Sequence, residues 1–176
     1  MSAFPYVVFF TGVNNPRDGC IVIGQDEKPV FFEFETNSSM CTTVGDSLRA
    51  RHIFSDRHPV AALHWGISPG LGQANINGRE VPIDDLVMPG STMNARRFVS
   101  ANGRTFEWRR SYQDPASYEL LAGPDTQIAS FRMFTHSTPV GLSHATLEYN
   151  FTDSVFLLEA LVTLSVNRCL DLNTAV

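Results

Sequence analysis

The sequence has few charged residues, one lysine and only three cysteines. Charged residues make up 18% of 176 residues, the formal net charge is −5, and twelve of the thirteen basic residues are arginine, the other being Lys28. No general positive field results, which excludes nucleic-acid binding through overall charge. Cys20, Cys41 and Cys169 lie far apart and form no CxxC pair, which argues against a disulfide framework and a zinc site. We therefore expect reduced core thiols and no resident metal or cofactor.

The chain also lacks a stretch typical of a signal peptide or a membrane span. Residues 1–12 are apolar but carry no basic segment, and Pro5 with its β-branched neighbours suits a strand. A membrane span needs ~20 mostly apolar residues, whereas Glu159 interrupts the C-terminal apolar run, and Asn167 and Arg168 end it. We therefore predict a cytoplasmic protein without a transmembrane span, and peripheral membrane contact stays open.

Familiar catalytic and phosphate-binding motifs are absent. The chain contains no Gly-x-Ser-x-Gly, no Gly-x-x-x-x-Gly-Lys, no Gly-x-Gly-x-x-Gly and no His-Glu-x-x-His. Asp84 and Asp85 are adjacent carboxylates, but neighbours in a short turn point apart and more often cap a helix. No standard catalytic set can be assembled from the sequence.

The residues that are abundant predict a β-rich core. Hydrophobic residues make up 43% of the chain, with thirteen phenylalanines, which excludes disorder. Short runs of Val, Ile, Phe and Thr alternate with turn residues, as in sandwiches and barrels. Asn77-Gly78 and Asn102-Gly103 each separate two such runs, and Asn-Gly favours a type I′ hairpin turn. We predict a single domain over residues 1–176, with strands at 6–13, 19–24, 29–36, 40–44, 48–54, 60–65, 73–76, 79–82, 96–101, 104–111, 118–122, 127–134 and 145–150.

Residues 153–170 break the strand pattern. They contain no glycine or proline and follow a good N-cap, Thr152 or Asp153. Apolar side chains cover every side of the segment, which is typical of a helix surrounded by protein or lipid. Because the run is too short for a membrane span, we predict a C-terminal helix wrapped by strands.

Several segments resemble a known family. They are 60–65, 76–78, 97–109, 118–121 and 128–131, followed by the apolar helix, and the hairpin with Arg-Phe, Asn-Gly-Arg and Phe-Glu-Trp-Arg is the most specific. In these segments the chain resembles small proteins, numerous in mushroom-forming fungi, that are known only as a domain of unknown function. The resemblance covers about residues 29–170. It implies the Tubby-C and phospholipid-scramblase-like fold, a closed antiparallel barrel of about twelve strands around a hydrophobic C-terminal helix. It implies no established activity, and the basic residues of Tubby's phosphoinositide site have no matching motif here.

The second hairpin provides a candidate anion site. A two-residue loop at 102–103 would place Arg97 opposite Trp108, where it can stack on the indole, and Arg96 opposite Arg109. Like charges directly opposed on two strands cost stability, so a compensating group is expected.

Two readings of this arginine pair remain open. Two guanidinium groups could clamp a phosphate or a carboxylate. Alternatively, Glu107 or Glu119 could neutralise them, and a bulge would change the pairing. The candidate ligand-binding residues are Arg96, Arg97, Glu107, Trp108 and Arg109.

Histidines offer a second candidate site, for catalysis. His64 shares a strand face with His58 if the strand is unbroken, and His144 lies in a separate, turn-rich segment. His64 or His144 together with Glu107 could act as acid and base, whereas ordinary surface histidines are the alternative. Glu159, if enclosed, would need a partner or a raised pKa, although near the helix N-terminus it could also reach solvent.

Three functions therefore remain open. The first is a non-enzymatic β-barrel module that binds a lipid-like, hydrophobic or phosphorylated small ligand. The second is a small enzyme with a His/carboxylate site at the barrel mouth, where pockets commonly lie. The third is a self-associating or partner-binding scaffold, since incomplete barrels expose strand edges. The sequence leaves the oligomeric state undecided.

Overall fold

Strands and one terminal helix make up most of the described chain. The computed structural model describes residues 4–25, 30–46, 59–66 and 69–173. Lys28, His58 and the strand predicted at 48–54 lie outside these residues. The elements are β1 (Tyr6–Gly12), β2 (Cys20–Gly24), β3 (Phe31–Thr36), β4 (Cys41–Asp46), β5 (Pro59–Trp65), β6 (Gly72–Ile76), β7 (Arg79–Pro82), η2 (Ile83–Leu86), β8 (Met88–Pro89), β9 (Ala95–Val99), β10 (Thr105–Arg110), β11 (Tyr118–Leu121), β12 (Gln127–Thr138), β13 (Gly141–Tyr149) and α1 (Ser154–Asn173).

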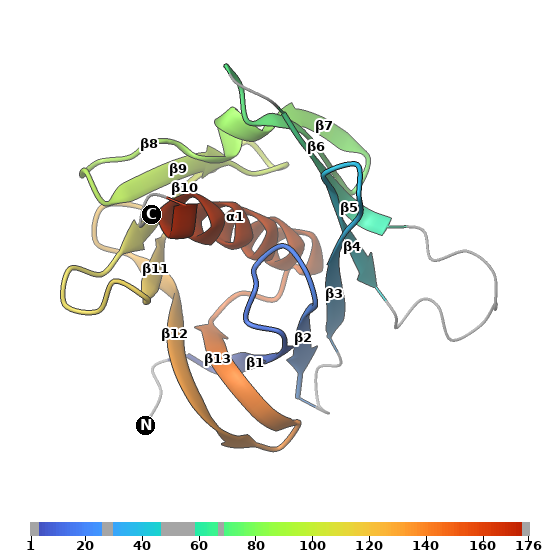
Figure 1. Ribbon diagram of the computed structural model, residues 1–176. Coiled ribbons are helices and arrows are strands. Elements are labelled where there is room, and N and C mark those ends of the chain that lie inside the picture. Colours follow the sequence, from blue (N-terminus) through green and yellow to red (C-terminus); the bar gives the residue numbers. More distant parts are fainter. Residues whose placement is uncertain (1–3, 26–29, 47–58, 67–68, 174–176) are drawn as a thin grey trace.

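The thirteen strands form one antiparallel sheet in the order β7-β6-β5-β4-β3-β2-β1-β13-β12-β11-β10-β9-β8. In the middle of the sheet β1 pairs with β13, with Tyr6 opposite Tyr149. From this pair two meanders lead outward, one to the edge strand β7 and the other to the edge strand β8. The sheet curls around α1, which lies in its concave face (Figure 1).

The sheet does not close, so the predicted barrel is wrong. Among the described residues no ladder joins the edge strands β7 and β8. β7 ends at Pro82, and β8 has only two residues, the second of which is Pro89. Proline cannot donate to a ladder and such short strands form few bonds, so neither edge offers a continuous partner. The 3₁₀ helix η2 links the two edges and buries Ile83 and Leu86 instead.

The two Asn-Gly hairpins turn in different ways. Asn77 and Gly78 have φ angles of 51° and 84°, which confirms the predicted turn with two positive φ angles. In the other hairpin only Gly103 has a positive φ, 80°, and its N–H donates to the carbonyl of Ser100. Ser100 N–H in turn donates to Arg104 O over 2.9 Å. This is a three-residue loop, a type I turn followed by a left-handed glycine.

The longer loop shifts the pairing of β9 and β10 by one residue from the prediction. Arg96 lies opposite Trp108, Arg97 opposite Glu107 and Ala95 opposite Arg109. Because strand side chains alternate between faces, a shift of one residue turns every side chain of β9 to the other face. The predicted opposition of Arg96 and Arg109 is therefore wrong.

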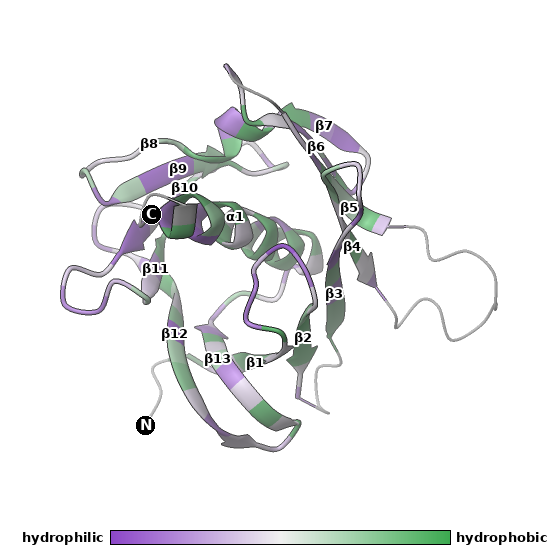
Figure 2. Ribbon diagram, in the orientation of Figure 1, coloured by the Kyte–Doolittle hydropathy of each residue, from purple (hydrophilic) through white to green (hydrophobic). Residues whose placement is uncertain are grey.

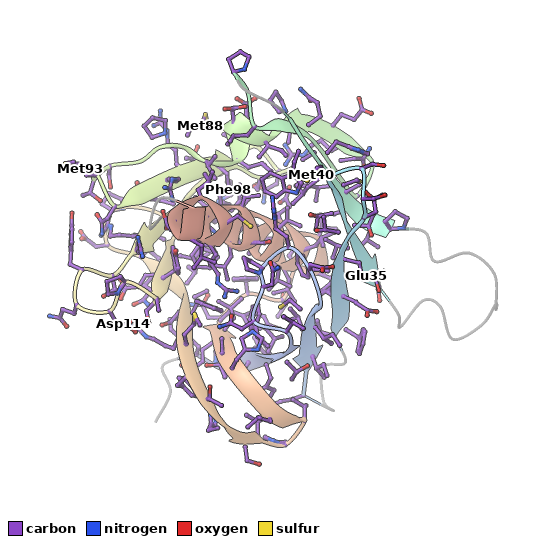
Figure 3. All side chains as sticks on the ribbon, viewed as in Figure 1. Glu35, Met40, Met88, Met93, Phe98 and Asp114 are labelled. Atoms are coloured by element: carbon purple, nitrogen blue, oxygen red, sulfur yellow. The ribbon has the colours of Figure 1, made fainter. Side chains whose placement is uncertain are left out.

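The C-terminal helix is confirmed, and it is deeply enclosed. Asp153 is its N-cap, with Oδ1 accepting hydrogen bonds from the backbone N–H groups of Val155 and Phe156. Every residue from 156 to 169 is buried, and Figure 2 shows α1 largely in hydrophobic colours. Phe98 of β9 lies among the side chains between sheet and helix, its ring 6.4 Å from that of Phe156 (Figure 3). Polar groups in this stretch therefore need partners within the protein.

The three cysteines are buried and form no disulfide. Burial raises the pKa of Cys20 to about 11 and that of Cys169 to about 12, so both are neutral thiols near pH 7. In the described ranges, no helix has the length and apolar character that crossing a membrane requires.

Candidate functional site

Arg168 is a buried guanidinium near the C-terminal end of α1. The residue is 5% exposed, and burial lowers its pKa. Its Nη2 donates to Asn14 Oδ1 over 2.9 Å and lies 3.8 Å from the sulfur of Met133, while Cζ lies 4.9 Å from the ring centre of Phe131. Across the described part of the chain, no carboxylate forms an ion pair with Arg168. The charge is therefore held by an amide, a thioether and a ring, without a neutralising anion.

Asp171, one turn further along α1, is engaged elsewhere. Its Oδ1 accepts from Arg96 Nη2 over 2.8 Å, and its Oδ2 accepts from the hydroxyl of Tyr118 over 2.7 Å. Arg110 Nε lies 3.9 Å from the same Oδ2. Burial and then this carboxylate raise the pKa of Tyr118. Asp171 thus joins the helix to β9, β10 and β11, and no ion pair joins it to Arg168.

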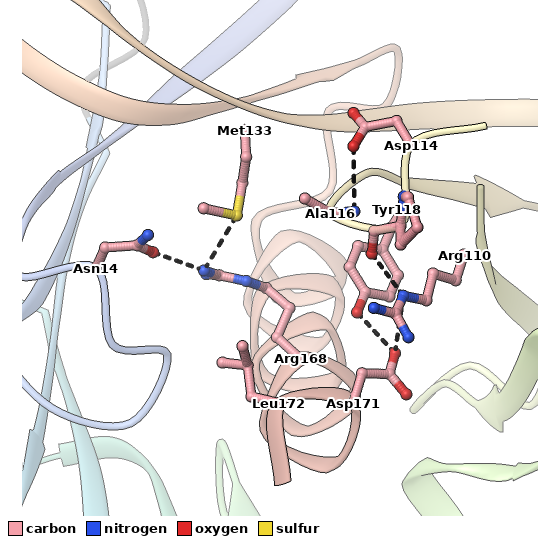
Figure 4. Close-up of a pocket in the computed structure, with 10 residues that line it drawn as sticks. Asn14, Arg110, Asp114, Ala116, Tyr118, Met133, Arg168, Asp171 and Leu172 are labelled. Atoms are coloured by element: carbon pink, nitrogen blue, oxygen red, sulfur yellow. Dashed lines mark hydrogen bonds and ion pairs between the residues drawn. The ribbon is translucent and has the colours of Figure 1, made fainter. Parts of the chain in front are cut away.

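Arg168 and Asp171 line a pocket of about 370 Å³ (Figure 4). Its walls come from the β1–β2 loop, the end of β10, the β10–β11 loop, β12 and the last turns of α1. Figure 4 shows Arg168 between Asn14 and Met133, with Tyr118, Arg110 and Asp171 on the other side. The lining residues are Asn14, Arg110, Asp114, Pro115, Ala116, Tyr118, Met133, Arg168, Asp171 and Leu172.

The structure separates the two arginines of the predicted anion clamp. Arg96 turns inward, where its Nη1 donates to Asn167 Oδ1 over 3.1 Å in addition to its ion pair with Asp171. Arg109 lies on the other face and donates to Glu107 Oε1 over 2.9 Å. Arg96 therefore belongs to the helix end, and Arg109 to a separate cluster.

Glu107 neutralises Arg109, as the alternative interpretation expected. Both carboxylate oxygens of Glu107 accept from Ser91, one from its backbone N–H and one from its hydroxyl, each over 2.6 Å. Burial by itself would raise the pKa of Glu107, but the bonds from Ser91 and Arg109 together lower it. Arg97 is exposed, whereas Trp108 is 1% exposed and donates through Nε1 to Thr163. The five predicted ligand-binding residues therefore do not share one site.

The predicted His/carboxylate set is not brought together. His64 lies on β5, His144 on β13 and Glu107 on β10, and four strands separate β5 from β13. His64 is exposed, with Nε2 4.0 Å from the sulfur of Cys41. Burial lowers the pKa of His144, whose ring lies 6.4 Å from that of Phe10. No group of three or more His, Cys, Asp or Glu side chains within the described ranges could hold a metal ion.

Glu159 joins the two sides of the open sheet. It is 2% exposed, and its Oε1 accepts from Arg79 Nη2 and from the backbone N–H of Ala101, each over 2.8 Å. Arg79 belongs to the edge strand β7, and Ala101 to the turn between β9 and β10. Burial raises the pKa of Glu159, although Ala101 and Arg79 act in the opposite direction. The carboxylate is thus enclosed and partnered, and it spans the opening that β7 and β8 leave.

The pH dependence of stability should report this carboxyl group. Because its pKa is raised above 4.5, the folded state binds the proton more tightly than the unfolded state. Its contribution to stability is complete below the unfolded pKa and is lost as the pH rises through the folded pKa. Glu159→Gln cannot bind this proton. We therefore expect the stability of the native protein relative to Glu159→Gln to increase from about pH 7.5 to about pH 4.5, measured by urea unfolding. A difference that does not change with pH would contradict this prediction.

Arg168 is a site residue that was not predicted from the sequence, where it only ends the apolar run. A charge inside a segment with apolar residues on all sides is nevertheless a signal for a buried, functional group. Asn14 and Asp114, which also line the pocket, belong to loops. No local sequence pattern predicts that these loops lie beside the helix. Arg110 lies one residue beyond the predicted arginine pair.

Comparisons with known proteins identify a family but no activity. A family model described as a family of unknown function, DUF6593, matches residues 14–164. Neither a curated protein nor a solved structure gives a significant match. The matched region includes every strand from β2 to β13, together with the first half of α1, and β1 lies before it. The chain therefore belongs to the DUF6593 family of unknown function.

Proposed function

We propose that this protein is a non-enzymatic module that binds a small amphiphilic anion in the pocket beside Arg168. The observation that carries the proposal is the nearly buried guanidinium of Arg168, which lines the pocket and forms no ion pair among the described residues. A buried charge without a counter-ion costs folding free energy. An anion in the pocket would supply the missing negative charge, and binding would offset this cost.

The other pocket walls favour a ligand with an apolar part. Apolar surface beside the guanidinium comes from Met133, Leu172, Ala116, Pro115 and the ring of Tyr118. Ligand pockets usually combine such walls with a few polar groups that fix orientation. A lipid-like or other amphiphilic small molecule fits this combination.

Binding is favoured over catalysis by the chemistry of the lining. The lining contains no histidine and no cysteine. The Tyr118 hydroxyl already donates to Asp171, and its raised pKa keeps it protonated near neutral pH, so it is not available as a base. The groups named for the enzymatic alternative, His64, His144 and Glu107, do not line this pocket.

The wider setting also belongs to the proposal. We place the protein in the cytoplasm, in a fungal family with a distant relation to Tubby-C and scramblase-like proteins, and with at most peripheral contact with membranes. Self-association stays an alternative prediction. Phe134 and Leu142 of the β12–β13 hairpin are 45% and 71% exposed and offer apolar surface for it.

Variants of Arg168 test the proposal directly. For the tightest-binding member of an octanoate, octyl sulfate and octyl phosphate panel, we expect Arg168→Gln to weaken binding about tenfold or more in isothermal titration calorimetry. Arg97→Gln makes the same chemical change on an exposed arginine and should leave affinity unchanged. Equal affinity of the native protein and Arg168→Gln would overturn the proposal.

A second position tests the pocket without disturbing the core. Leu172 lines the pocket and is 55% exposed, so its substitution should leave folding intact. Leu172→Glu places a negative charge beside the pocket and should weaken anion binding several-fold, whereas Leu172→Gln removes the same apolar surface without adding charge. If both variants bind equally well, the anion lies elsewhere.

A further inference from the structure

The charges around the pocket point to the class of ligand, given the proposed function on which this inference rests. Two of the lining side chains are positive, Arg110 and Arg168, and two are negative, Asp114 and Asp171. Arg96 adds one positive charge behind the wall through its ion pair with Asp171. The local sum is one positive charge, so one negative charge on the ligand would complete neutrality.

The negative groups are held in place and remain close to any ligand. Asp114 accepts hydrogen bonds from the Ser117 hydroxyl and from the backbone N–H of Ala116, and chiefly the Ser117 bond lowers its pKa. Asp171 is fixed by Arg96 and Tyr118. Asp114 therefore stays charged near neutral pH, and a second negative charge on the ligand would meet repulsion from both carboxylates.

The helix adds to this repulsion. Asp171 and Leu172 belong to the last turn of α1, which ends at Asn173, so the pocket lies at the helix C-terminus. The C-terminal end of a helix carries the negative end of its dipole. An anion in this pocket is thus attracted by Arg168 and opposed by the helix end, which is the reverse of a phosphate site at a helix N-terminus.

The size of the pocket limits the apolar part of the ligand. A volume of about 370 Å³ is near the lower end of the ~300–1,000 Å³ range of small-molecule sites. Met133 and Leu172 supply the flexible apolar surface next to the charge. A short alkyl chain or a single ring fits this space better than a long acyl chain.

We infer that the pocket binds a small amphiphile with a single negative charge, such as a medium-chain carboxylic acid, and discriminates against dianionic phosphate monoesters. Arg168 provides the attraction. The discrimination against a second negative charge comes from Asp114, Asp171 and the end of α1.

Four eight-carbon amphiphiles with different head groups test this inference. Octanoate and octyl sulfate carry one negative charge, octyl phosphate is largely dianionic above its second pKa of about 6, and octanol is neutral. Calorimetric titrations near pH 7.5, below the micelle concentrations, should show octanoate and octyl sulfate binding about fivefold or more tightly than octyl phosphate, with octanol weakest. Sulfate and phosphate have the same tetrahedral shape, so this comparison isolates charge.

The outcomes separate the two proposals. If octyl phosphate binds as tightly as octyl sulfate or more tightly, the ligand class is wrong while the anion-binding function stands. If none of the three anions binds better than octanol, the proposed function itself fails. Leu172→Lys adds a positive charge beside the pocket and should reduce the difference in affinity between octyl sulfate and octyl phosphate. Leu172→Gln should leave this difference unchanged. An unchanged difference in affinity in Leu172→Lys would contradict discrimination by charge.

Discussion

Replacing Glu159 by alanine is expected to lower the free energy of unfolding by about 3 kcal/mol. The substitution leaves the backbone N–H of Ala101 and the Nη2 of Arg79 without their buried acceptor. It also opens a cavity in the helix face, because Glu159 is 2% exposed. These two bonds tie the edge strand β7 and the β9–β10 turn to α1. Their loss should therefore weaken the attachment of both sides of the open sheet to the helix. Urea unfolding followed by circular dichroism measures the change.

Two control variants separate the contributions of charge and contact. Glu80→Ala removes an exposed carboxylate from the same edge strand and should change stability by less than about 0.5 kcal/mol. Glu159→Gln keeps an acceptor oxygen and should cost much less than Glu159→Ala at neutral pH, because the buried charge is itself disfavoured. If Glu159→Ala were as stable as Glu80→Ala, the two sides of the open sheet would not depend on this carboxylate for their stability.

Replacing Asp171 by alanine should have an effect of similar size, about 3 kcal/mol, at the other end of the helix. The hydroxyl of Tyr118, a residue that is 3% exposed, would lose its acceptor, and Arg96 would lose its ion pair. Arg96, Arg110 and Arg168 would then lie around one helix end without the carboxylate that offsets them. Asp125→Ala, on an exposed turn, is the matched control and should be nearly neutral.

The same variant should gain a response to inorganic phosphate. With Asp171 removed, the arginines form a stronger anion site, so added phosphate should raise the melting temperature of Asp171→Ala more than that of the native protein. Potassium chloride at equal ionic strength controls for screening. If phosphate stabilises both proteins equally, the arginines do not act together on an anion.

The strands, the helix and its cap could be predicted from the sequence because local patterns determine them. Runs of β-branched and aromatic residues located strands such as Tyr6–Gly12, and Asp153 marked the start of the helix. The two Asn-Gly pairs show that a local signal predicts a turn but does not determine its type. The same dipeptide forms a turn with two positive φ angles at Asn77-Gly78 and part of a three-residue loop at Asn102-Gly103, since strand pairing on either side selects between the two.

Closure of the sheet and assembly of the pocket depend on contacts between distant residues. Pro82 and Pro89 indicate interrupted strands, but only the three-dimensional arrangement shows that these two strands are the edges. Arg168 meets Asn14 across a separation of 154 residues. No periodicity connects positions so far apart, so the candidate site chosen from the sequence fell on a local hairpin instead.

The order of elements along the chain has a consequence for synthesis. The helix that fills the concave face of the sheet follows all thirteen strands, and β13, the central partner of β1, immediately precedes it. A ribosome therefore releases an apolar sheet surface before the segment that covers it. Nascent chains of this protein should bind chaperones that recognise exposed apolar strands until α1 has emerged.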